Sequence, residues 1–511
     1  MLTQTAAMKP MLLAVDLGTE SVRAALVSTE GRIVRRARRN YPMHTPQPGW
    51  AEQDPTQWWD ATAAAIREVL DRSRRAEDVA GIGVCGQMHG PVPVAADGSV
   101  LAGPVQLWCD KRAAPLAAAV ARRADGGALS ALAANPPTPA WMGFKIAWEQ
   151  RYRSSRHARA WKYLPPKDYL NFRLTGVAAT DHSEASGSFV MDAVRRRWSP
   201  TLADALSIDR RVLPDIHGPH EVIGVVTAEA AARTGLRVGT PVVTGGGDML
   251  CLLLGAAITR PGRACDTTGT ASVLSVFAPQ PIADPRVMNL HHVVPGWIAF
   301  GICDSGGGAL HWFRAVAGDT YGVLDRLAAA VPPGADGLFF FPYLQGQRTL
   351  GPPYARGVLF GLTPGHGRGA MARAIMEGVT LDLRRALEVI TASGLQVHEM
   401  RTIGGGARSA VWSNIKADVY RVPVRTFAEF EGGIVGAAIL AGTGVGIFAD
   451  AAGAAERLTV PGAEVQPDPE QVVRYQRQYA TFARLHDLLL PGFDLLEEQG
   501  RASGEPVPVR E

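Results

Sequence analysis

Cysteines are few in this chain of 511 residues, and they follow no binding pattern. There are five of them, an odd number, widely scattered, and no two have the spacing of a CxxC motif. This distribution speaks against a disulfide framework and against a structural zinc site, which needs closely spaced thiolates. It is typical of a protein in a reducing compartment, so we expect a cytoplasmic location.

Long apolar runs and a dominant charge are also missing. The longest apolar stretches, such as residues 249–258, have about half the length that a membrane span needs. The first ten residues lack the basic region and apolar core of a signal peptide. With 52 basic and 48 acidic residues, the net charge of +4 is too even to favour nucleic acid or an acidic membrane as partner.

Two strand–turn–strand segments in the sequence resemble one another. The first contains Gly18-Thr19-Glu20-Ser21-Val22 and the second Gly269-Thr270-Ala271-Ser272-Val273, each between two apolar runs. Each segment lies near the start of one half of the chain, so an internal duplication is expected. The sequence therefore predicts two α/β domains, residues 10–243 and 244–491, with the boundary near residues 241–247.

Both Gly-Thr turns are suited to phosphate. Glycine permits a tight turn and close approach, and backbone N–H groups then point at the ligand. Each turn alone is more typical of an ordinary hairpin, but two that face each other from two domains would grip one triphosphate, and the paired occurrence favours phosphate binding. Only the first copy has a carboxylate two residues before its glycine, Asp16, where the second has Thr267. Asp16 is therefore the candidate for Mg2+, held partly through water.

Other glycine clusters adjoin residues that carry chemistry. The triple glycines at 404–406 and 306–308 precede helical segments and are either nucleotide seats or simple turns. Asp248 follows a third cluster at a strand end, where a carboxylate serves as a general base or as a helix N-cap. Near the ends of other strands, Met88-His89 and the Trp108 to Asp110 segment offer hydrogen bonds and an apolar wall to a sugar.

Together these motifs resemble the FGGY family of carbohydrate kinases, and within it the xylulose kinases. The resemblance covers nearly the whole chain, in the family's order. The Gln-Met-His-Gly motif at 87–90 is the part that resembles xylulose kinases in particular. The matching segments are residues 16–19, 86–90, 107–112, 166–170, 174–176, 180–181, 185–186, 245–248, 268–270, 355–357, 360–362 and 404–409.

The resemblance implies a fold and a set of roles. The fold is two duplicated ribonuclease H-like, actin-like ATPase domains with an intervening cleft for ATP and sugar. The domain 10–243 would bind the sugar, Mg2+ and phosphate, and the domain 244–491 the nucleotide. By position, Asp248 matches the catalytic base and a substrate contact, and Asp16 matches the carboxylate near Mg2+. Sugar-binding positions are Met88 and His89, with Trp108 and Asp110 close by. Nucleotide-binding positions are Thr19, Ser21, Arg23, Thr270, Gly307, Gly405 and Gly406.

Three positions depart from the family pattern. Met249 stands where xylulose kinases have an amide side chain after the catalytic aspartate, which removes a sugar hydrogen bond. The first family signature is poor around residues 142–145, and Ala370 replaces an acidic or amide residue of the second. These departures leave the phosphate machinery unchanged and bear on the choice of sugar.

The expected activity is phosphorylation of D-xylulose to D-xylulose 5-phosphate by ATP with Mg2+. A kinase for ribulose, a tetritol or glycerol is the nearest alternative, because a few side chains decide specificity. An actin- or chaperone-like ATPase is the alternative from another class, but it would not need both the 87–89 motif and Asp248. The expected partner is the small sugar, with no nucleic acid and no membrane, and a homodimer is left open.

Overall fold

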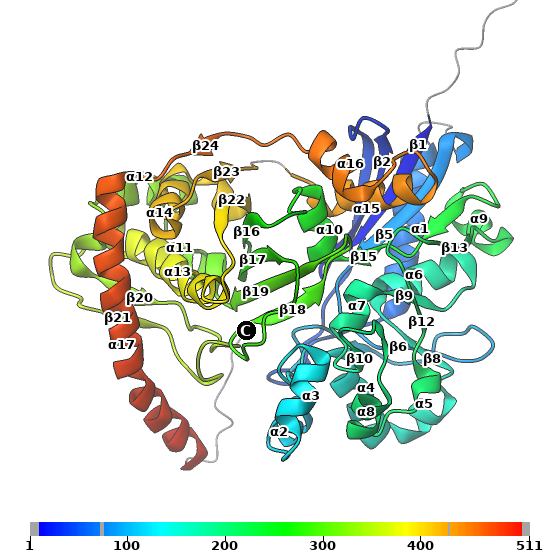
Figure 1. Ribbon diagram of the computed structural model, residues 1–511, viewed down its shortest axis with the longest axis horizontal. Coiled ribbons are helices and arrows are strands. Elements are labelled where there is room, and N and C mark those ends of the chain that lie inside the picture. Colours follow the sequence, from blue (N-terminus) through cyan, green and yellow to red (C-terminus); the bar gives the residue numbers. More distant parts are fainter. Residues whose placement is uncertain (1–9, 72–75, 428–429, 503–511) are drawn as a thin grey trace, which may run out of the picture. The chain divides into compact units, whose positions relative to one another are not determined.

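The computed structural model describes residues 10–71, 76–427 and 430–502 (Figure 1). The chain forms two compact units. The first comprises the described residues up to Thr259, together with Asn289–Gly296 and Glu431–Thr459. The second comprises Arg260–Met288, Trp297–Phe430 and the described residues from Val460 onward.

This division differs from the boundary expected near residues 241–247. The segment just after that point stays in the first unit, because β15 (Gly246–Gly247) pairs with β5 (Val79–Gly86). Helix α10 (Asp248–Gly255) also packs against α15 (Gly432–Gly444), which returns to this unit from far along the sequence. Packing between segments so far apart in the sequence produces no local pattern at residues 241–247, so the sequence did not indicate the observed boundary.

The first unit is built on a mixed sheet with the order β13-β14-β5-β1-β2-β3. As expected, the first three strands form an antiparallel meander, while β5 runs parallel to β1 and β14 parallel to β5. All seven residues of β1 are buried, since helices cover the sheet. The bounds are β1 (Met11–Leu17), β2 (Ser21–Ser28), β3 (Ile33–Asn40), β13 (Val222–Val225) and β14 (Pro241–Val243).

Helices α1 (Pro55–Asp71) and α15 pack on this sheet, α1 against β2 and β3 and α15 against β1 and β5 (Figure 1). The contact of α15 is close: a Cβ added at Gly83 would lie 2.1 Å from the Ala437 carbonyl oxygen. The expected helical stretch 113–134 is two helices, α2 (Ala114–Ala121) and α3 (Gly126–Ala133).

The remaining elements of the first unit are β4 (Glu52–Gln53), η1 (Ala76–Asp78), β6 (Val92–Val94), β7 (Val105–Gln106), α4 (Met142–Tyr152), α5 (Ser154–Arg159), β8 (Lys162–Leu164), α6 (Pro166–Thr175), β9 (Ala179–Asp181), α7 (His182–Ser186), β10 (Met191–Asp192), β11 (Arg197–Trp198), α8 (Pro200–Ala205), η2 (Arg210–Val212), β12 (Asp215–His217), α9 (Ala228–Thr234) and α16 (Ala451–Leu458).

The second unit repeats the plan of the first. Its sheet contains the order β19-β17-β16-β22-β23-β24, in which β16, β17 and β19 are antiparallel and β22 runs parallel to β16. The bounds are β16 (Gly262–Thr268), β17 (Ser272–Ala278), β19 (Trp297–Cys303), β22 (Val397–Gly404), β23 (Val424–Thr426) and β24 (Glu464–Val465). The predicted duplication and actin-like α/β fold class are thus confirmed.

Long helices complete the second unit. Helix α13 (Arg368–Thr391) packs against β17 and β19, and α17 (Pro469–Ala502) runs beyond the expected 470–490 with Pro491 inside it. Of the helices within the described ranges, none has the length and apolarity to cross a bilayer. The other elements are α11 (Gly306–Ala317), α12 (Tyr321–Ala329), η3 (Ala335–Gly337), β20 (Phe339–Phe341), β21 (Val358–Phe360), η4 (Gly405–Arg408) and α14 (Ala410–Tyr420), with β18 (Met288–His291) spanning the border between the units.

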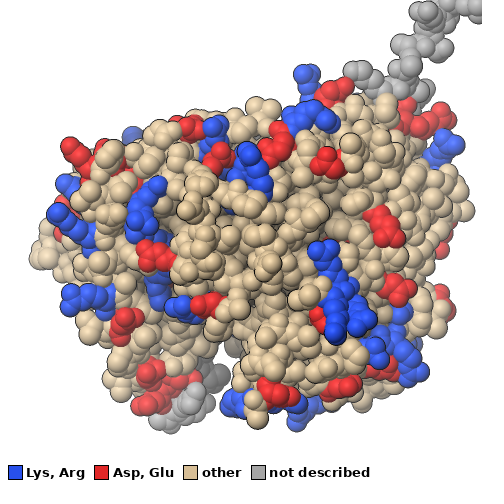
Figure 2. All heavy atoms as spheres, in the orientation of Figure 1, with Lys and Arg blue, Asp and Glu red and all other residues tan. Residues whose placement is uncertain are grey.

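Acidic and basic side chains are mixed over the face drawn in Figure 2, as the near-even charge balance leads one to expect. Residues 1–9, where a signal peptide was sought, lie outside the described residues.

Candidate active site

The predicted base Asp248 is the first residue of α10, at the end of a tight glycine loop. Gly245 has a φ of +76°, and a Cβ added there would lie 1.8 Å from the Val84 carbonyl oxygen. A side chain at this position would be excluded by both the backbone conformation and the contact. The loop therefore turns directly against β5 and delivers Asp248 to the end of the sheet.

The electrostatic setting of Asp248 suits proton transfer. Burial, followed by the negative charge of Asp16, raises the pKa of Asp248 from 3.8 to about 7. The Met249 backbone N–H, 2.7 Å from Asp248 Oδ1, and the charge of Arg23 act in the opposite direction. A carboxylate with a pKa near 7 is largely deprotonated at physiological pH. It can therefore accept a proton, and it binds that proton more strongly than an ordinary carboxylate does.

Asp16 lies in the same part of the first unit, at the end of β1. Its side chain is almost fully buried, and Oδ2 accepts a hydrogen bond from Arg23. Oδ1 has no hydrogen-bond partner among the described residues. Burial raises the pKa of Asp16, opposed by Arg23. Mg2+ is bound in proteins through carboxylate oxygens and water, so this oxygen is available as a ligand.

Arg23 is held between two carboxylates. Opposite Asp16 in the β1–β2 register, it also donates through Nη1 to Glu431 Oε2 at 2.7 Å. Glu431 directly precedes α15, and a Cβ at Gly433 in that helix would lie 2.5 Å from Asp16 Oδ2. Glu431 did not emerge from the sequence, because its partner is 408 residues away and no local motif marks it. Described residues contain no cluster of three or more acidic, histidine or cysteine ligands, so a metal at Asp16 would keep several waters.

The first Gly-Thr turn is fastened by aromatic and amide side chains. Tyr41 donates to the Gly18 carbonyl oxygen, and Gln53 Nε2 donates to the Thr19 carbonyl oxygen at 2.6 Å. Trp108 Nε1 donates to Thr19 Oγ1 at 3.2 Å. Trp108, expected near the sugar, is thus in contact with a residue expected at the nucleotide. Ser21 is buried and closes the turn, its carbonyl oxygen accepting from Gly18 N at 3.0 Å.

Met88 and His89 follow the end of β5, beside the Asp248 loop. A Cβ added at Gly247 would lie 2.5 Å from Met88 Sδ, so Met88 packs directly on the residue before Asp248. His89 has a φ of +69°, in the left-handed region that few residues other than glycine adopt, and its ring meets Trp141 edge to face at 5.0 Å. The structure therefore brings Met88 to the predicted base, while the His89 ring packs on Trp141.

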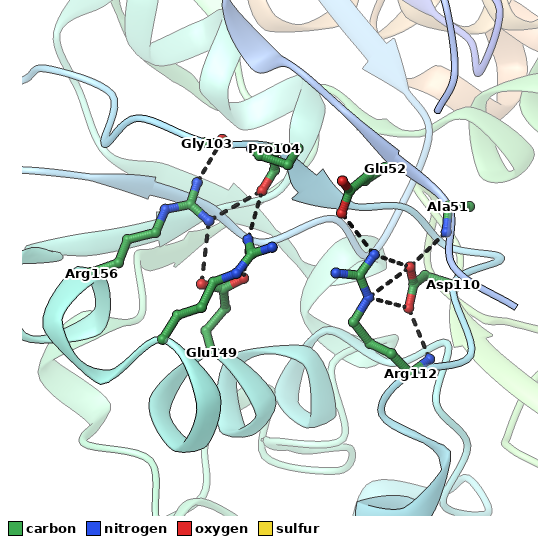
Figure 3. A network of polar contacts seen from close by, with 9 residues as sticks. Ala51, Glu52, Gly103, Pro104, Asp110, Arg112, Glu149 and Arg156 are labelled. Carbon is green, nitrogen blue, oxygen red and sulfur yellow. Dashed lines mark hydrogen bonds and ion pairs between the residues drawn. The ribbon is translucent and has the colours of Figure 1, made fainter. Parts of the chain in front are cut away.

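Asp110 belongs to a buried ion network (Figure 3). Its Oδ1 accepts from Arg112 N at 2.9 Å, and its Oδ2 accepts from Ala51 N and Arg112 Nη2, both at 2.7 Å. Arg112 Nη2 also donates to Glu52 at 2.8 Å, and its guanidinium lies 3.5 Å from the centre of the Trp50 ring. Both oxygens of Asp110 are thus engaged within the protein.

In the second unit, three glycine segments meet at the second Gly-Thr turn. Gly307 N donates to the Gly269 carbonyl oxygen and Gly308 N to the Thr270 carbonyl oxygen, both at 2.9 Å. A Cβ at Gly406 would lie 2.5 Å from Thr268 Cγ2. Four of the predicted nucleotide-binding residues lie at or near this turn: Thr270, Gly307, Gly405 and Gly406. Among them the amide of Gly307 is committed to the turn, whereas Thr270 and Gly405 are exposed.

The comparisons with known proteins agree with this geometry. Residues 11–255 match the description "FGGY family of carbohydrate kinases, N-terminal domain", and residues 265–445 match the C-terminal domain of the same family. The xylulose kinase of Bacillus subtilis (strain 168) is 30% identical over 485 residues, which cover 93% of this chain and 96% of that protein.

Two solved structures extend the likeness to the fold. The xylulose kinase from Rhodospirillum rubrum has a TM-score of 0.86 and 32% identity, and the match covers 95% of this chain and all of the other. A gluconate kinase from Lactobacillus acidophilus has a TM-score of 0.90 at 24% identity, over 96% of this chain and all of the other. At 24% identity, the match to the gluconate kinase supports the similarity of the fold alone.

Proposed function

This chain belongs to the FGGY family of carbohydrate kinases, which are ATP-dependent phosphotransferases, and we propose that its acceptor is D-xylulose. The product would be D-xylulose 5-phosphate. The observation that carries the proposal is the loop at Asp248, where a carboxylate with a pKa of about 7 directly follows the glycine on which Met88 packs. The full-length likeness to xylulose kinases supports the choice of sugar.

In the proposed reaction, Asp248 accepts the proton of the terminal hydroxyl while the hydroxyl oxygen attacks the γ-phosphorus of ATP. The new P–O bond forms as the bond between the γ-phosphorus and the β–γ bridging oxygen breaks, and ADP leaves. Asp248 then gives its proton to solvent. Met88 and His89 would hold the sugar against the base, so that its hydroxyl is oriented before the transfer.

Asp16 would hold Mg2+, which when bound neutralises the charge of the phosphates. Arg23 keeps Asp16 in place and, with Thr19 and Ser21, is proposed to contact the nucleotide from the first unit. Thr270 and the glycines at 307, 405 and 406 are proposed as nucleotide contacts of the second unit. We assign Asp110 a supporting role, because its carboxylate is saturated by donors from the protein itself.

One observation favours a second candidate substrate. Met249 is half-buried beside the base and offers a thioether where the resemblance leads one to expect an amide. An apolar wall at this point is compatible with another ketose or polyol, such as ribulose, a tetritol or glycerol.

The test measures ADP release from the purified protein with MgATP and one acceptor at a time. The acceptors are D-xylulose, ribulose, a tetritol, glycerol and gluconate. The proposal predicts the highest kcat/KM with D-xylulose, and a phosphate ester at C5 by phosphorus NMR. If D-xylulose gives no turnover and a tetritol or glycerol is phosphorylated efficiently, the protein is a kinase but the xylulose proposal is wrong.

A further inference from the structure

The loop that leads to Asp248 is held at both ends by buried side chains outside it. At its start, the Thr244 carbonyl oxygen accepts from Lys167 Nζ at 3.1 Å and from Asn171 Nδ2 at 2.7 Å. At its end, Gly247 N donates to Ser183 Oγ at 3.0 Å. The residues between are glycines, which have little conformational preference of their own, so attachments from outside determine the path of this loop.

The donors at the start of the loop come from α6 and are completely buried. Lys167 and Asn171 are both 0% exposed. Lys167 forms ion pairs with Asp168 at 2.5 Å and Asp181 at 3.0 Å, and each of these carboxylates is itself 0% exposed. Buried ion pairs seldom stabilise a fold more than apolar side chains of similar size would. A contribution to stability therefore does not explain this arrangement, whereas fixing the Thr244 carbonyl does.

The acceptor at the end of the loop comes from the first turn of α7. Ser183 is 0% exposed, and its own backbone N–H donates to Asp181 Oδ2 at 2.7 Å. Asp181 therefore contacts both Lys167 and the backbone of Ser183, so the two attachments of the loop share one carboxylate. The loop is fixed at two points by a single connected network.

We propose that Ser183 and Asn171 are positioning residues for Asp248: through Gly247 and Thr244 they set the direction in which α10 presents its first carboxylate. The inference rests on the proposed role of Asp248 as the base. Proton removal and attack require close alignment, and a displacement of the base by about 1 Å can reduce the rate about 100-fold. Neither residue contacts the substrate in this proposal; each acts through the backbone of the loop.

The first test compares Ser183→Ala with Ser188→Ala. Ser188 is equally buried just beyond α7, where its hydroxyl donates to the Ala185 carbonyl oxygen at 2.6 Å and accepts from Val190 N at 3.0 Å. We expect kcat to fall about tenfold or more in Ser183→Ala, with the KM for sugar and ATP unchanged and with recovery in Ser183→Thr. Ser188→Ala should lower Tm by a similar amount while keeping kcat. Equal kcat values in the two alanine variants would overturn the proposal.

Asn171→Leu tests the other end of the loop, because Lys167 and its ion pairs stay intact. We expect a smaller loss of kcat than in Ser183→Ala, again without a change in KM, since Thr244 keeps one donor. A loss of Tm with no loss of kcat would show that Asn171 supports the fold only.

A double variant separates this inference from the proposed function. If Ser183 acts through Asp248, Ser183→Ala should cause no further loss in the Asp248→Asn background, whereas independent effects would multiply. Multiplying effects would overturn the positioning role. Near-native turnover of Asp248→Asn alone would instead overturn the proposed function, and an inactive Asp248→Asn beside a fully active Ser183→Ala would overturn only the inference.

Discussion

The two Gly-Thr turns share a fold and differ in their charges. In the first, Asp16 lies opposite Arg23 in the β1–β2 register, and one of its oxygens has no partner among the described residues. In the second, the equivalent pair is Thr267 opposite Val273, which carries no charge. The comparison indicates that the two sheets contain corresponding turns, and that only the first has an acidic residue at this position, Asp16, for which we propose the Mg2+ contact.

The second turn does have a carboxylate close by, one residue earlier in its strand. Asp266 accepts from Lys416 Nζ at 2.9 Å and from Tyr420 OH at 2.7 Å. Successive residues of a strand point to opposite faces of a sheet, so a shift by one residue places Asp266 on the face opposite to that of an Asp16 equivalent. Lys416 and Tyr420 are four residues apart on α14 and reach it together. Asp266 is neutralised inside the unit, and Asp16 is left with one oxygen available.

Removal of the base in the first unit should have the largest effect. Asp248→Asn keeps the shape of the side chain and loses its ability to accept a proton, so kcat should fall by about 10²–10⁴-fold. Nucleotide affinity, measured by titration with ATP, should be retained. A variant that keeps near-native turnover on its best sugar would remove Asp248 from the proposed chemistry.

Removal of the charge of Asp266, the carboxylate neutralised by Lys416 in the second unit, should lower the stability of the fold. Asp266→Asn leaves Lys416 buried without its counter-charge, which typically costs about 3–5 kcal/mol. Thermal unfolding should show a marked fall in Tm, with part of it restored in Asp266→Asn combined with Lys416→Met. An unchanged Tm would mean that this ion pair does not hold the turn.

The pH dependence of kcat/KM should distinguish Asp16 from Asp266. Because the pKa of Asp248 is raised to about 7, kcat/KM should be full above this pH and fall about tenfold per unit below it. Since the charge of Asp16 contributes to that shift, Asp16→Asn should move the midpoint to lower pH, and Asp266→Asn should leave it in place. A midpoint near the ordinary value of 3.8 in the native protein would contradict this account.

The raised pKa of Asp248 also makes the stability of the fold depend on pH. The folded-state pKa of Asp248 is higher than its ordinary value, so its contribution to stability is present below about pH 3.8 and is lost as pH rises through about 7. Asp248→Asn should therefore be more stable than the native protein above pH 7 and no more stable at low pH. Thermal unfolding across this range measures the difference, and equal Tm values at high pH would contradict it.

The smallest effect is expected at Met249. One hydrogen bond to a bound hydroxyl contributes about 0.5–1.5 kcal/mol, so Met249→Asn should lower the KM for D-xylulose by roughly 2- to 12-fold. Met249→Leu is the matched control, because it changes the shape of the side chain without adding a polar group. An unchanged KM in Met249→Asn would show that this position does not contact the sugar.

Much of this organisation could be predicted from local sequence. The repeated Gly-Thr-x-Ser-Val pattern, placed near the start of each half, predicts the duplicated sheets, because strand–turn–strand units have a local signature. Glu431 could not be predicted, since its contact with Arg23 depends on α15 packing against β1 and β5. The boundary near residues 241–247 differs from the observed division for the same reason. Ser183 gives no signal either, because a serine at a helix start is ordinary until its neighbour is seen to be Gly247.

The most direct test of the difference between the two turns is the activity of Asp16→Asn and Asp266→Asn measured side by side, per folded molecule, with D-xylulose and MgATP. Loss of one preorganised contact that stabilises charge in the transition state typically reduces kcat by about 10²–10³-fold. We expect a loss of this size in Asp16→Asn at unchanged Tm, and native kcat with a lowered Tm in Asp266→Asn. Equal losses of kcat in the two variants, or a fully active Asp16→Asn, would contradict the proposed difference between the two turns.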